Sequence, residues 1–391
     1  MKTSFQLIEV PCAAGLLALV ALWFPAAQIH AADENNVGQS QPALTSEEAF
    51  GKLLFERETF GGNGRTCATC HTGPGFTINP QDVQARFAAN PNDSLIDSDD
   101  GVGNSFMRLL THATIRLKIP LPPNIELEEN PAAAFVEVFR GNPTPINIAL
   151  EHCNSLDVDC LEDHPVLMHD GRFHTLEEQA QRAVEAHTEH TEEPAFDELR
   201  AMARFQATLF SSPALEAFAA GGPAPELPHP DTLTQSQHRG LVLFKSSNFC
   251  GGCHTGPMLN QRISGRRFES VRVSELNEIG NPLHTFLVTN PDGSVTRVVS
   301  PDPGRLLITG GQVDANAPGQ VKDINFFKIP TLWGIKHTAP YFHDNSAKTL
   351  ENVLRHYDKF FRIRDQLKGF KNTKGLTAQE QADIIEFLKL L

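Results

Sequence analysis

The sequence predicts a mainly α-helical protein made of two domains related by internal duplication, with a β-hairpin inserted in the second domain. Three observations predict this class. The chain has 391 residues, which exceeds the usual size of one domain. A Cys-x-x-Cys-His pentapeptide occurs twice, and the residues around each copy repeat as well. Capping patterns before apolar stretches mark the starts of helices in both halves.

Residues 1–32 predict a secretory signal peptide. Lys2 supplies positive charge, and the apolar run 12–27 is too short and poorly flanked for a membrane anchor. We expect cleavage near Ala31 or Ala32. Since no later segment is apolar enough to span a bilayer, the mature chain is expected to have no membrane span and to be periplasmic.

Composition is that of a globular protein, with 40% hydrophobic and 20% charged residues. The formal net charge of −14 argues against a nucleic acid partner, because phosphates require a basic face. This charge is consistent with simple solubility, or with steering towards a partner that carries a positive patch.

The seven cysteines fall into three groups. Cys12 leaves with the signal peptide, and four others belong to the two repeated motifs. Cys153 and Cys160 remain, and in an oxidising compartment we expect them to form a disulfide that closes a small loop.

Both repeated motifs match the attachment pattern of a c-type haem. They are Cys67-Ala-Thr-Cys70-His71 and Cys250-Gly-Gly-Cys253-His254. Two thiols on one helical turn can form thioethers with the two haem vinyl groups, and the adjacent imidazole then meets the iron. Two motifs behind a signal sequence favour haem over zinc, which requires four ligands gathered at one point.

The surroundings of the motifs indicate two cytochrome c-like domains. Gly51-Lys-Leu-Leu-Phe55 precedes the first motif and Gly240-Leu-Val-Leu-Phe244 precedes the second. Further along, residues 169–177 align without a gap to residues 343–351, with His-Asp at the start and Thr-Leu-Glu at the end. Each half therefore has one haem motif and one matching downstream segment.

The elements follow in order along the chain. Capping boxes predict helices after Thr45, Thr234 and Thr377. The Gly- and Pro-rich residues 221–232 predict a linker between an N-terminal domain, 33–220, and a C-terminal domain, 233–391. In the second domain, residues 285–299 predict a β-hairpin around the turn Asn290-Pro-Asp-Gly293.

With these motifs in order, the sequence resembles the bacterial dihaem cytochrome c peroxidase family, which includes the MauG enzymes. Besides the haem motifs, the resemblance rests on Asn142-Pro-Thr144, Asp170-Gly-Arg172, Leu176-Glu-Glu-Gln179 and Thr338-Ala-Pro-Tyr-Phe-His343. It implies two covalently bound haem c groups, with the first as the peroxide site and the second as an electron-transfer haem. It also implies a calcium ion between the domains, for which Asn147, Thr331 and Pro330 lie in matching neighbourhoods.

The resemblance places the catalytic glutamate on Glu178, with Glu177 as the alternative. Cleavage of peroxide requires an acid-base group beside the iron. A pair of glutamates can also be no more than surface charge on a helix. In the second half the position of Glu178 is taken by Asn352.

The far ligand of the second haem departs from the family pattern. Where the family commonly has methionine, alignment places Tyr357, as in MauG, and tyrosine is a known ligand of haem iron. The alternative is a packed aromatic residue, with the neighbouring His356 as the ligand. The first half has Ala183 at the position of Tyr357, so the first iron is expected to stay open and the second to be closed.

A second departure concerns the pocket of the first haem. Many family members have a histidine soon after the first motif that must leave the iron, but no histidine occurs between His71 and His112. His112 lies in an apolar stretch and is expected to be a packed residue. Where the family has an aromatic residue directly before Asp-Gly-Arg, this chain has His169. Where the family has a glutamine three residues before the aspartate, this chain has Leu167.

Three functions compete. The first is a peroxidase that reduces hydrogen peroxide with electrons from a small cytochrome or cupredoxin. The second is a MauG-like enzyme that oxidises a tryptophan or tyrosine of a partner protein. The third is a dihaem electron carrier without catalysis, which would show two low-spin haems, whereas an enzyme would show one high-spin haem.

Overall fold

The three predicted capping boxes open helices of the structure, which is a computed structural model. Thr45 Oγ1 accepts a hydrogen bond from Glu48 N at 3.3 Å, and Glu48 Oε2 accepts one from Thr45 N at 2.7 Å. Thr234 with Gln237 and Thr377 with Glu380 make the same reciprocal pairs. These bonds satisfy backbone donors that the first turn leaves without a partner, so the predictions for these helix starts are confirmed.

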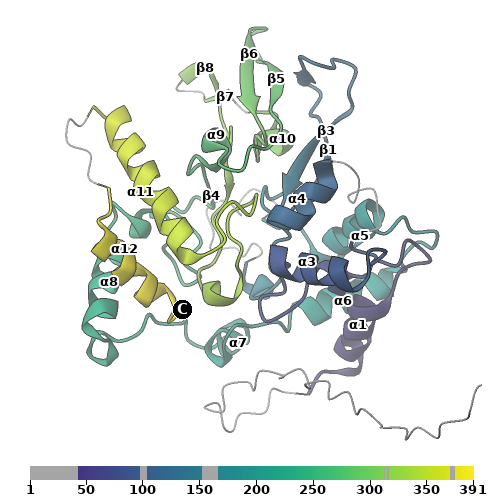
Figure 1. Cartoon of the computed structure of the whole chain (residues 1–391), viewed down its shortest axis with the longest axis horizontal. Helices are drawn as coiled ribbons and strands as arrows, with labels where there is room; N and C mark the ends of the chain where they lie inside the picture. Colours follow the sequence, from purple (N-terminus) through teal and green to yellow (C-terminus); the bar gives the residue numbers. More distant parts are fainter. Residues whose placement is uncertain (1–42, 97–103, 152–165, 312, 315–316, 370–374) are drawn as a thin grey trace, which may run out of the picture. The chain divides into compact units, whose positions relative to one another are not determined.

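The structure describes residues 43–96, 104–151, 166–311, 313–314, 317–369 and 375–391 (Figure 1). The predicted signal peptide and the predicted disulfide between Cys153 and Cys160 lie outside these ranges. All the elements below belong to one unit, residues 44–391. Within the described ranges, no helix has the length and apolar character needed to cross a membrane.

The first half contributes short helices and three strands. In order they are α1 (Ser46–Arg57), α2 (Cys67–Cys70), α3 (Pro80–Ala89), α4 (Asn104–His112), β1 (Ile115–Pro120), β2 (Ile125–Leu127), β3 (Phe135–Arg140), the 3-10 helix η2 (Ile148–Leu150), α5 (Leu176–His187), α6 (Phe196–Gln206) and α7 (Pro213–Ala219).

The second half contains the longest described helix, α11. Its elements are η4 (Pro230–Thr232), α8 (Gln235–Lys245), η5 (Cys250–Gly252), β4 (Phe268–Glu269), α9 (Val273–Leu276), β5 (His284–Thr289), β6 (Val295–Ser300), α10 (Leu306–Thr309), β7 (Val313–Asp314), β8 (Ala317–Val321), β9 (Phe327–Lys328), η6 (Ile335–His337), α11 (Leu350–Leu367) and α12 (Ala378–Leu388).

The repeated glycines mark the same helix contact in each half. α1 packs on α6 and α8 packs on α12 (Figure 1). A Cβ atom on Gly51 would lie 1.9 Å from the carbonyl oxygen of Ala201, and one on Gly240 would lie 2.0 Å from that of Asp383. Only glycine allows the two backbones to approach this closely.

The segments that align in the sequence also have matching backbones. Leu167 pairs with Phe173 in an isolated antiparallel bridge, and Tyr341 pairs with Ala347 in the same way. Gly171 and Asn345 occupy equivalent positions with φ of 70° and 57°. Asparagine is one of the few residues that adopt this left-handed conformation readily, so it can replace glycine in the second half.

The structure holds more sheet than the sequence predicts. β5 and β6 pair antiparallel around the turn at 290–293, and β2 of the first half adds to β5 to make a three-stranded sheet. β1 and β3 form a further antiparallel pair that the sequence analysis did not predict. Val136 and Val138 of β3 alternate towards a core shared with Phe286 of β5, so strands from both halves bury one another. The fold is therefore mixed helix and sheet.

Candidate haem sites

The first Cys-x-x-Cys-His motif forms one helical turn. α2 carries both cysteines, and His71 follows at its end, with its backbone N–H donating to Cys67 O at 3.0 Å. Cys67 packs against a cluster that includes Ala180 and Val184 of α5. Cys70 packs against a second cluster around Leu109. The motif therefore lies between two apolar groups, with α5 beside it.

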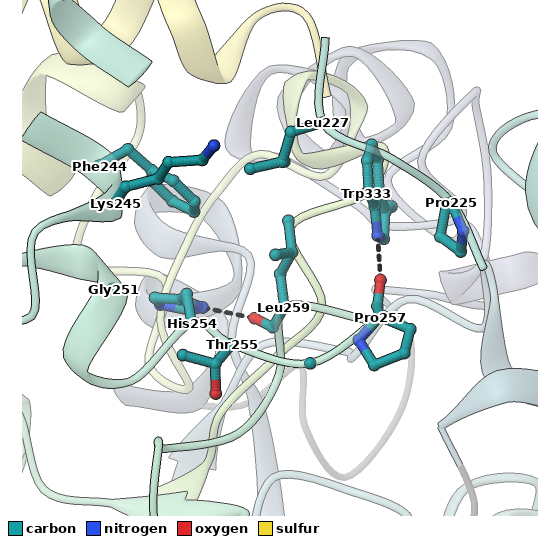
Figure 2. A pocket seen from close by; sticks show the side chains of 11 residues that line it. Pro225, Leu227, Phe244, Lys245, Gly251, His254, Thr255, Pro257, Leu259 and Trp333 are labelled. Atoms are coloured by element: carbon teal, nitrogen blue, oxygen red, sulfur yellow. Dashed lines mark hydrogen bonds between the residues drawn. The ribbon is translucent and has the colours of Figure 1, made fainter. Parts of the chain in front are cut away.

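Each motif histidine makes the same second contact. His71 Nδ1 lies 2.9 Å from Phe76 O, and His254 Nδ1 lies 2.7 Å from Leu259 O (Figure 2). Because a carbonyl oxygen can only accept, Nδ1 carries the proton and Nε2 keeps its lone pair for a metal. Burial lowers the pKa of His254 to about 4 and lowers the pKa of His71 in the same direction. Both neutral imidazoles suit an iron ligand.

A common turn sets up these contacts. Gly73 and Gly256 have φ of 66° and 72°, and Phe76 and Leu259 have φ of 49° and 54°. The positive φ values turn the chain back so that the carbonyl five residues after each histidine meets its ring.

A cavity of about 230 Å³ adjoins the second motif. Its walls include Cys250, Cys253, His254 and Tyr357, together with apolar side chains of α8, α11 and α12. The donor set and the largely apolar walls fit a covalently attached haem.

Tyr357 of α11 lies among aromatic side chains at this cavity. Its ring centroid is 5.7 Å from that of Phe361 and 6.3 Å from that of Phe342. Burial raises the pKa of Tyr357, and the nearby Cys253 and Cys250 raise it further. The structure therefore brings Tyr357 to the second motif.

His356, the alternative ligand, has a different place. Its Nε2 lies 2.8 Å from Val271 O, and its ring packs against Phe342 with centroids 4.6 Å apart. It is not among the residues that line the cavity. The side chain is committed to a backbone carbonyl on another segment.

At the first motif, α5 takes the place that α11 has at the second motif, but with different side chains. Ala183 occupies the position on α5 that Tyr357 occupies on α11. Glu178 lies in the first turn of α5, where its Oε2 accepts from His174 N at 3.1 Å and its own N–H donates to Thr175 Oγ1 at 3.1 Å. The Glu178 carboxylate thus completes the cap of α5. Glu177, one residue earlier, interacts electrostatically with Arg200 of α6.

A buried ionic network explains the Asp170-Gly-Arg172 segment structurally. Arg140, at the end of β3, donates to Asp170 Oδ2 at 2.6 Å and to both carboxylate oxygens of Asp302 at 2.6 and 2.9 Å. Arg172 Nε lies 3.1 Å from Asp170 Oδ1. Burial alone would raise the pKa of Asp302, but Arg140 lowers it overall. The network therefore ties β3 to both halves. The sequence analysis did not identify Arg140 or Asp302. Arg140 is a charged residue at the end of an apolar strand and Asp302 a charged residue in a loop, and neither pattern predicts an ion pair.

His169 and His343, which lie outside the motifs, are packed. His169 Nε2 lies 3.0 Å from Gly141 O, and burial lowers the pKa of His169 to about 4. His343 stacks on Phe327 with centroids 3.6 Å apart, and burial lowers its pKa to about 3. Both line the cavity. His112 lies at the end of α4, with its Nδ1 2.8 Å from Thr111 Oγ1.

At the predicted calcium position the Asn147 side chain is fully buried. Its Oδ1 accepts from Ser211 N at 2.9 Å, and its amide donates to Trp333 O at 3.1 Å and to Ser211 Oγ at 3.0 Å. Thr331 N donates to Glu151 Oε1 at 2.9 Å. The calcium site stays a prediction.

Sequence analysis also missed Trp333. Its indole Nε1 donates to Pro257 O at 2.8 Å, in the loop that carries His254 (Figure 2), and its side chain lines the cavity. Through its carbonyl it also holds Asn147 of the first half. The chain has two tryptophans, and Trp23 lies in the predicted signal peptide. That Trp333 is the one tryptophan expected in the mature chain was the available signal.

Two attachment motifs with matched histidine contacts fit a c-type cytochrome with two haem sites. Residues 45–219 match the family model described as Di-haem cytochrome c peroxidase. The chain is 29% identical over 161 residues to the cytochrome c551 peroxidase of Nitrosomonas europaea, covering 41% of this chain and 35% of that protein. It is 27% identical over 196 residues to the methylamine utilization protein MauG of Methylophilus methylotrophus, covering 49% of this chain and 45% of that protein.

The solved structures that the chain matches include a MauG-like protein associated with microbial copper homeostasis. That chain is 19% identical, with 90% of each chain covered and a TM-score of 0.46. Another is the diheme peroxidase BthA from Burkholderia thailandensis, 13% identical, with 90% of this chain and 86% of that chain covered and a TM-score of 0.45.

The family and the curated relatives are dihaem cytochrome c peroxidases and MauG-type oxidoreductases, and the predicted resemblance to them is confirmed. The matched family model describes di-haem proteins, so this resemblance implies two haem c groups. The matches span between about a quarter and a half of the length of the curated relatives.

Proposed function

We propose that this chain is a periplasmic dihaem c-type peroxidase that reduces hydrogen peroxide at the first haem, with electrons relayed through the second. The observation that carries the proposal is the pair of motif histidines, each with Nδ1 held by a carbonyl and Nε2 available. When bound, the haem supplies the iron that binds and reduces peroxide. A small cytochrome or cupredoxin would supply the electrons.

In this proposal the cysteines of the two motifs would hold the haems, and His71 and His254 would each bind one iron through Nε2. Tyr357 would be a further ligand of the second iron, since it lines the same cavity as His254. The Ala183 side chain, at the equivalent position on α5, offers no iron ligand, which supports the proposal that the first haem would bind peroxide. The difference between the two sites is what separates a catalytic haem from an electron-transfer haem.

The first experiment tests ligation in the purified ferric protein. Haem content should be two per chain, and EPR and resonance Raman spectra should show one high-spin and one low-spin haem. Two low-spin haems together with inertness to peroxide would instead identify an electron carrier and overturn the proposal.

Glu178 is proposed as the acid-base group that moves a proton between the two oxygens of peroxide, with Glu177 as the alternative. Glu178→Gln keeps the capping acceptor for His174 N, so α5 should remain intact. Peroxidase turnover should fall about 10²- to 10⁴-fold in this variant. Glu177→Gln is the matched control on the same turn, and a loss confined to Glu177→Gln would transfer the role to that residue.

A second function, oxidation of a tryptophan or tyrosine of a partner protein, is favoured by Tyr357. The identity of the axial ligand is a principal control of haem potential, and an anionic tyrosinate favours higher oxidation states of iron. The two functions differ in donor. Rapid oxidation of a reduced cytochrome by peroxide and this protein supports the peroxidase, whereas no oxidation of several cytochromes and cupredoxins supports the protein-oxidising enzyme.

A further inference from the structure

Asn142 contacts the loop of the first motif through both ends of its amide. Its Nδ2 donates to Cys70 O at 2.8 Å and to Phe76 O at 3.2 Å, and lies 3.3 Å from His71 Nδ1. Its Oδ1 accepts from Ile78 N at 3.1 Å. One side chain therefore bridges the residues before and after His71.

The orientation of this amide follows from its neighbours. Ile78 N can only donate, so it requires the amide oxygen, and Cys70 O can only accept, so it requires the amide nitrogen. The Asn142 nitrogen therefore faces Phe76 O. That carbonyl oxygen accepts from two donors, the Asn142 amide and His71 Nδ1.

The second half has the same backbone pattern without the amide. Thr144 Oγ1 accepts from Ile146 N at 3.1 Å, and Thr331 Oγ1 accepts from Trp333 N at 3.3 Å. Each of these threonines follows a proline and precedes a 3-10 helix, η2 or η6. This alignment places Ile329 at the position of Asn142.

Ile329 is an apolar residue that lines the cavity together with His254. An isoleucine side chain cannot donate a hydrogen bond, so it does not compete for Leu259 O. The bond from His254 to Leu259 O is 2.7 Å, and the bond from His71 to Phe76 O is 2.9 Å. The shorter bond is at the site without a competing amide.

A stronger hydrogen bond from the second ring nitrogen makes a histidine a more basic metal ligand. We propose that Asn142 is a positioning residue that shares the carbonyl of Phe76 and thereby makes His71 a weaker electron donor to its iron than His254 is. The inference rests on the proposed attachment of haem to both motifs. As a consequence, the reduction potential of the first haem is higher than it would be if His71 were the only donor to Phe76 O.

The test compares three residues at position 142 in the full-length protein with both haems. Asparagine donates towards Phe76 O, Asn142→Ala removes the donor, and Asn142→Asp places an acceptor near His71 Nδ1. The reduction potential of the first haem, measured by spectroelectrochemistry, should fall from wild type to Asn142→Ala and again to Asn142→Asp. The Fe–His stretching frequency of the reduced first haem, measured by resonance Raman, should rise in the same order.

The second haem is an internal comparison. Asn142 also lines the cavity beside His254 but, within the described part of the chain, has no hydrogen bond to the His254 loop, so the potential of the second haem should move less than that of the first in these variants. Ile329→Ala is the matched variant at the equivalent position, and it should leave the first haem unchanged. The inference is overturned if the reduction potential and the Fe–His frequency of the first haem are the same in wild type, Asn142→Ala and Asn142→Asp. It is also overturned if both variants lose the first haem, because Asn142 would then have a purely structural role. A wild-type protein with fewer than two haems would instead overturn the proposed function.

Discussion

Replacement of Gly240 by alanine tests the contact between α8 and α12, whose side chains line the cavity at the second candidate haem site. The new Cβ atom would lie 2.0 Å from Asp383 O and 2.9 Å from Phe387 Cβ, whereas real Cβ contacts essentially never fall below 3.0 Å. The first of these atoms belongs to the backbone of α12 and cannot rotate away. α8 and α12 must therefore move apart at a position where both helices are buried.

The expected loss of stability follows from two opposing effects. Forcing extra atoms into a packed contact costs about 1–3 kcal/mol, and more where backbone must shift. Alanine in a helix interior is favoured over glycine by about 1 kcal/mol. Because the contact distance is about 1 Å too short, the upper part of the packing range applies, and we expect a net loss of about 2 kcal/mol.

Urea unfolding followed by circular dichroism measures this change in the free energy of unfolding. Gly51→Ala should behave alike, because its Cβ would lie 1.9 Å from Ala201 O. Val242→Ala is the control on α8, where an exposed side chain should change stability by less than about 0.5 kcal/mol. If Gly240→Ala is as stable as wild type, the close contact between these helices is refuted.

Three further predictions concern charge and ligation. Asp302→Asn should lower the free energy of unfolding by about 3–5 kcal/mol, because Arg140 then stays buried with one of its two carboxylates lost; an unchanged urea midpoint would contradict this. Burial raises the pKa of Asp344 from its ordinary value near 3.8 to about 6. Between these pH values the folded state keeps a proton on Asp344 that the unfolded state has released. The wild-type protein therefore loses stability as the pH rises through this range. Asp344→Asn should therefore gain up to about 3 kcal/mol over wild type between pH 4 and pH 7, whereas a constant difference across this range would reject the raised pKa. Tyr357→Phe removes the proposed far ligand, so EPR should show the second haem becoming high-spin; a spectrum that stays low-spin would exclude Tyr357 as the ligand.

Much of the local structure could be predicted because it depends on near neighbours. A threonine with a glutamate or glutamine three residues later predicts a capping box, and α1, α8 and α12 begin there. The strands were harder. β1 and β3 are held by partners 15 to 25 positions away in the chain, and β2 pairs with β5 across more than 150 residues, so no local pattern specifies them.

The sequence by itself determined the two Cys-x-x-Cys-His motifs, the repeated flanking segments and hence the resemblance to dihaem peroxidases, because the chemistry of haem attachment needs those residues at that spacing. Only the tertiary structure decided which side chains surround each motif. It showed that Tyr357 rather than His356 lines the cavity, that Glu178 caps α5, and that Asn142 shares a carbonyl with His71. Adjacent residues on a helix point about 100° apart, and partners come from distant segments, so direction and contact depend on packing that spacing does not encode.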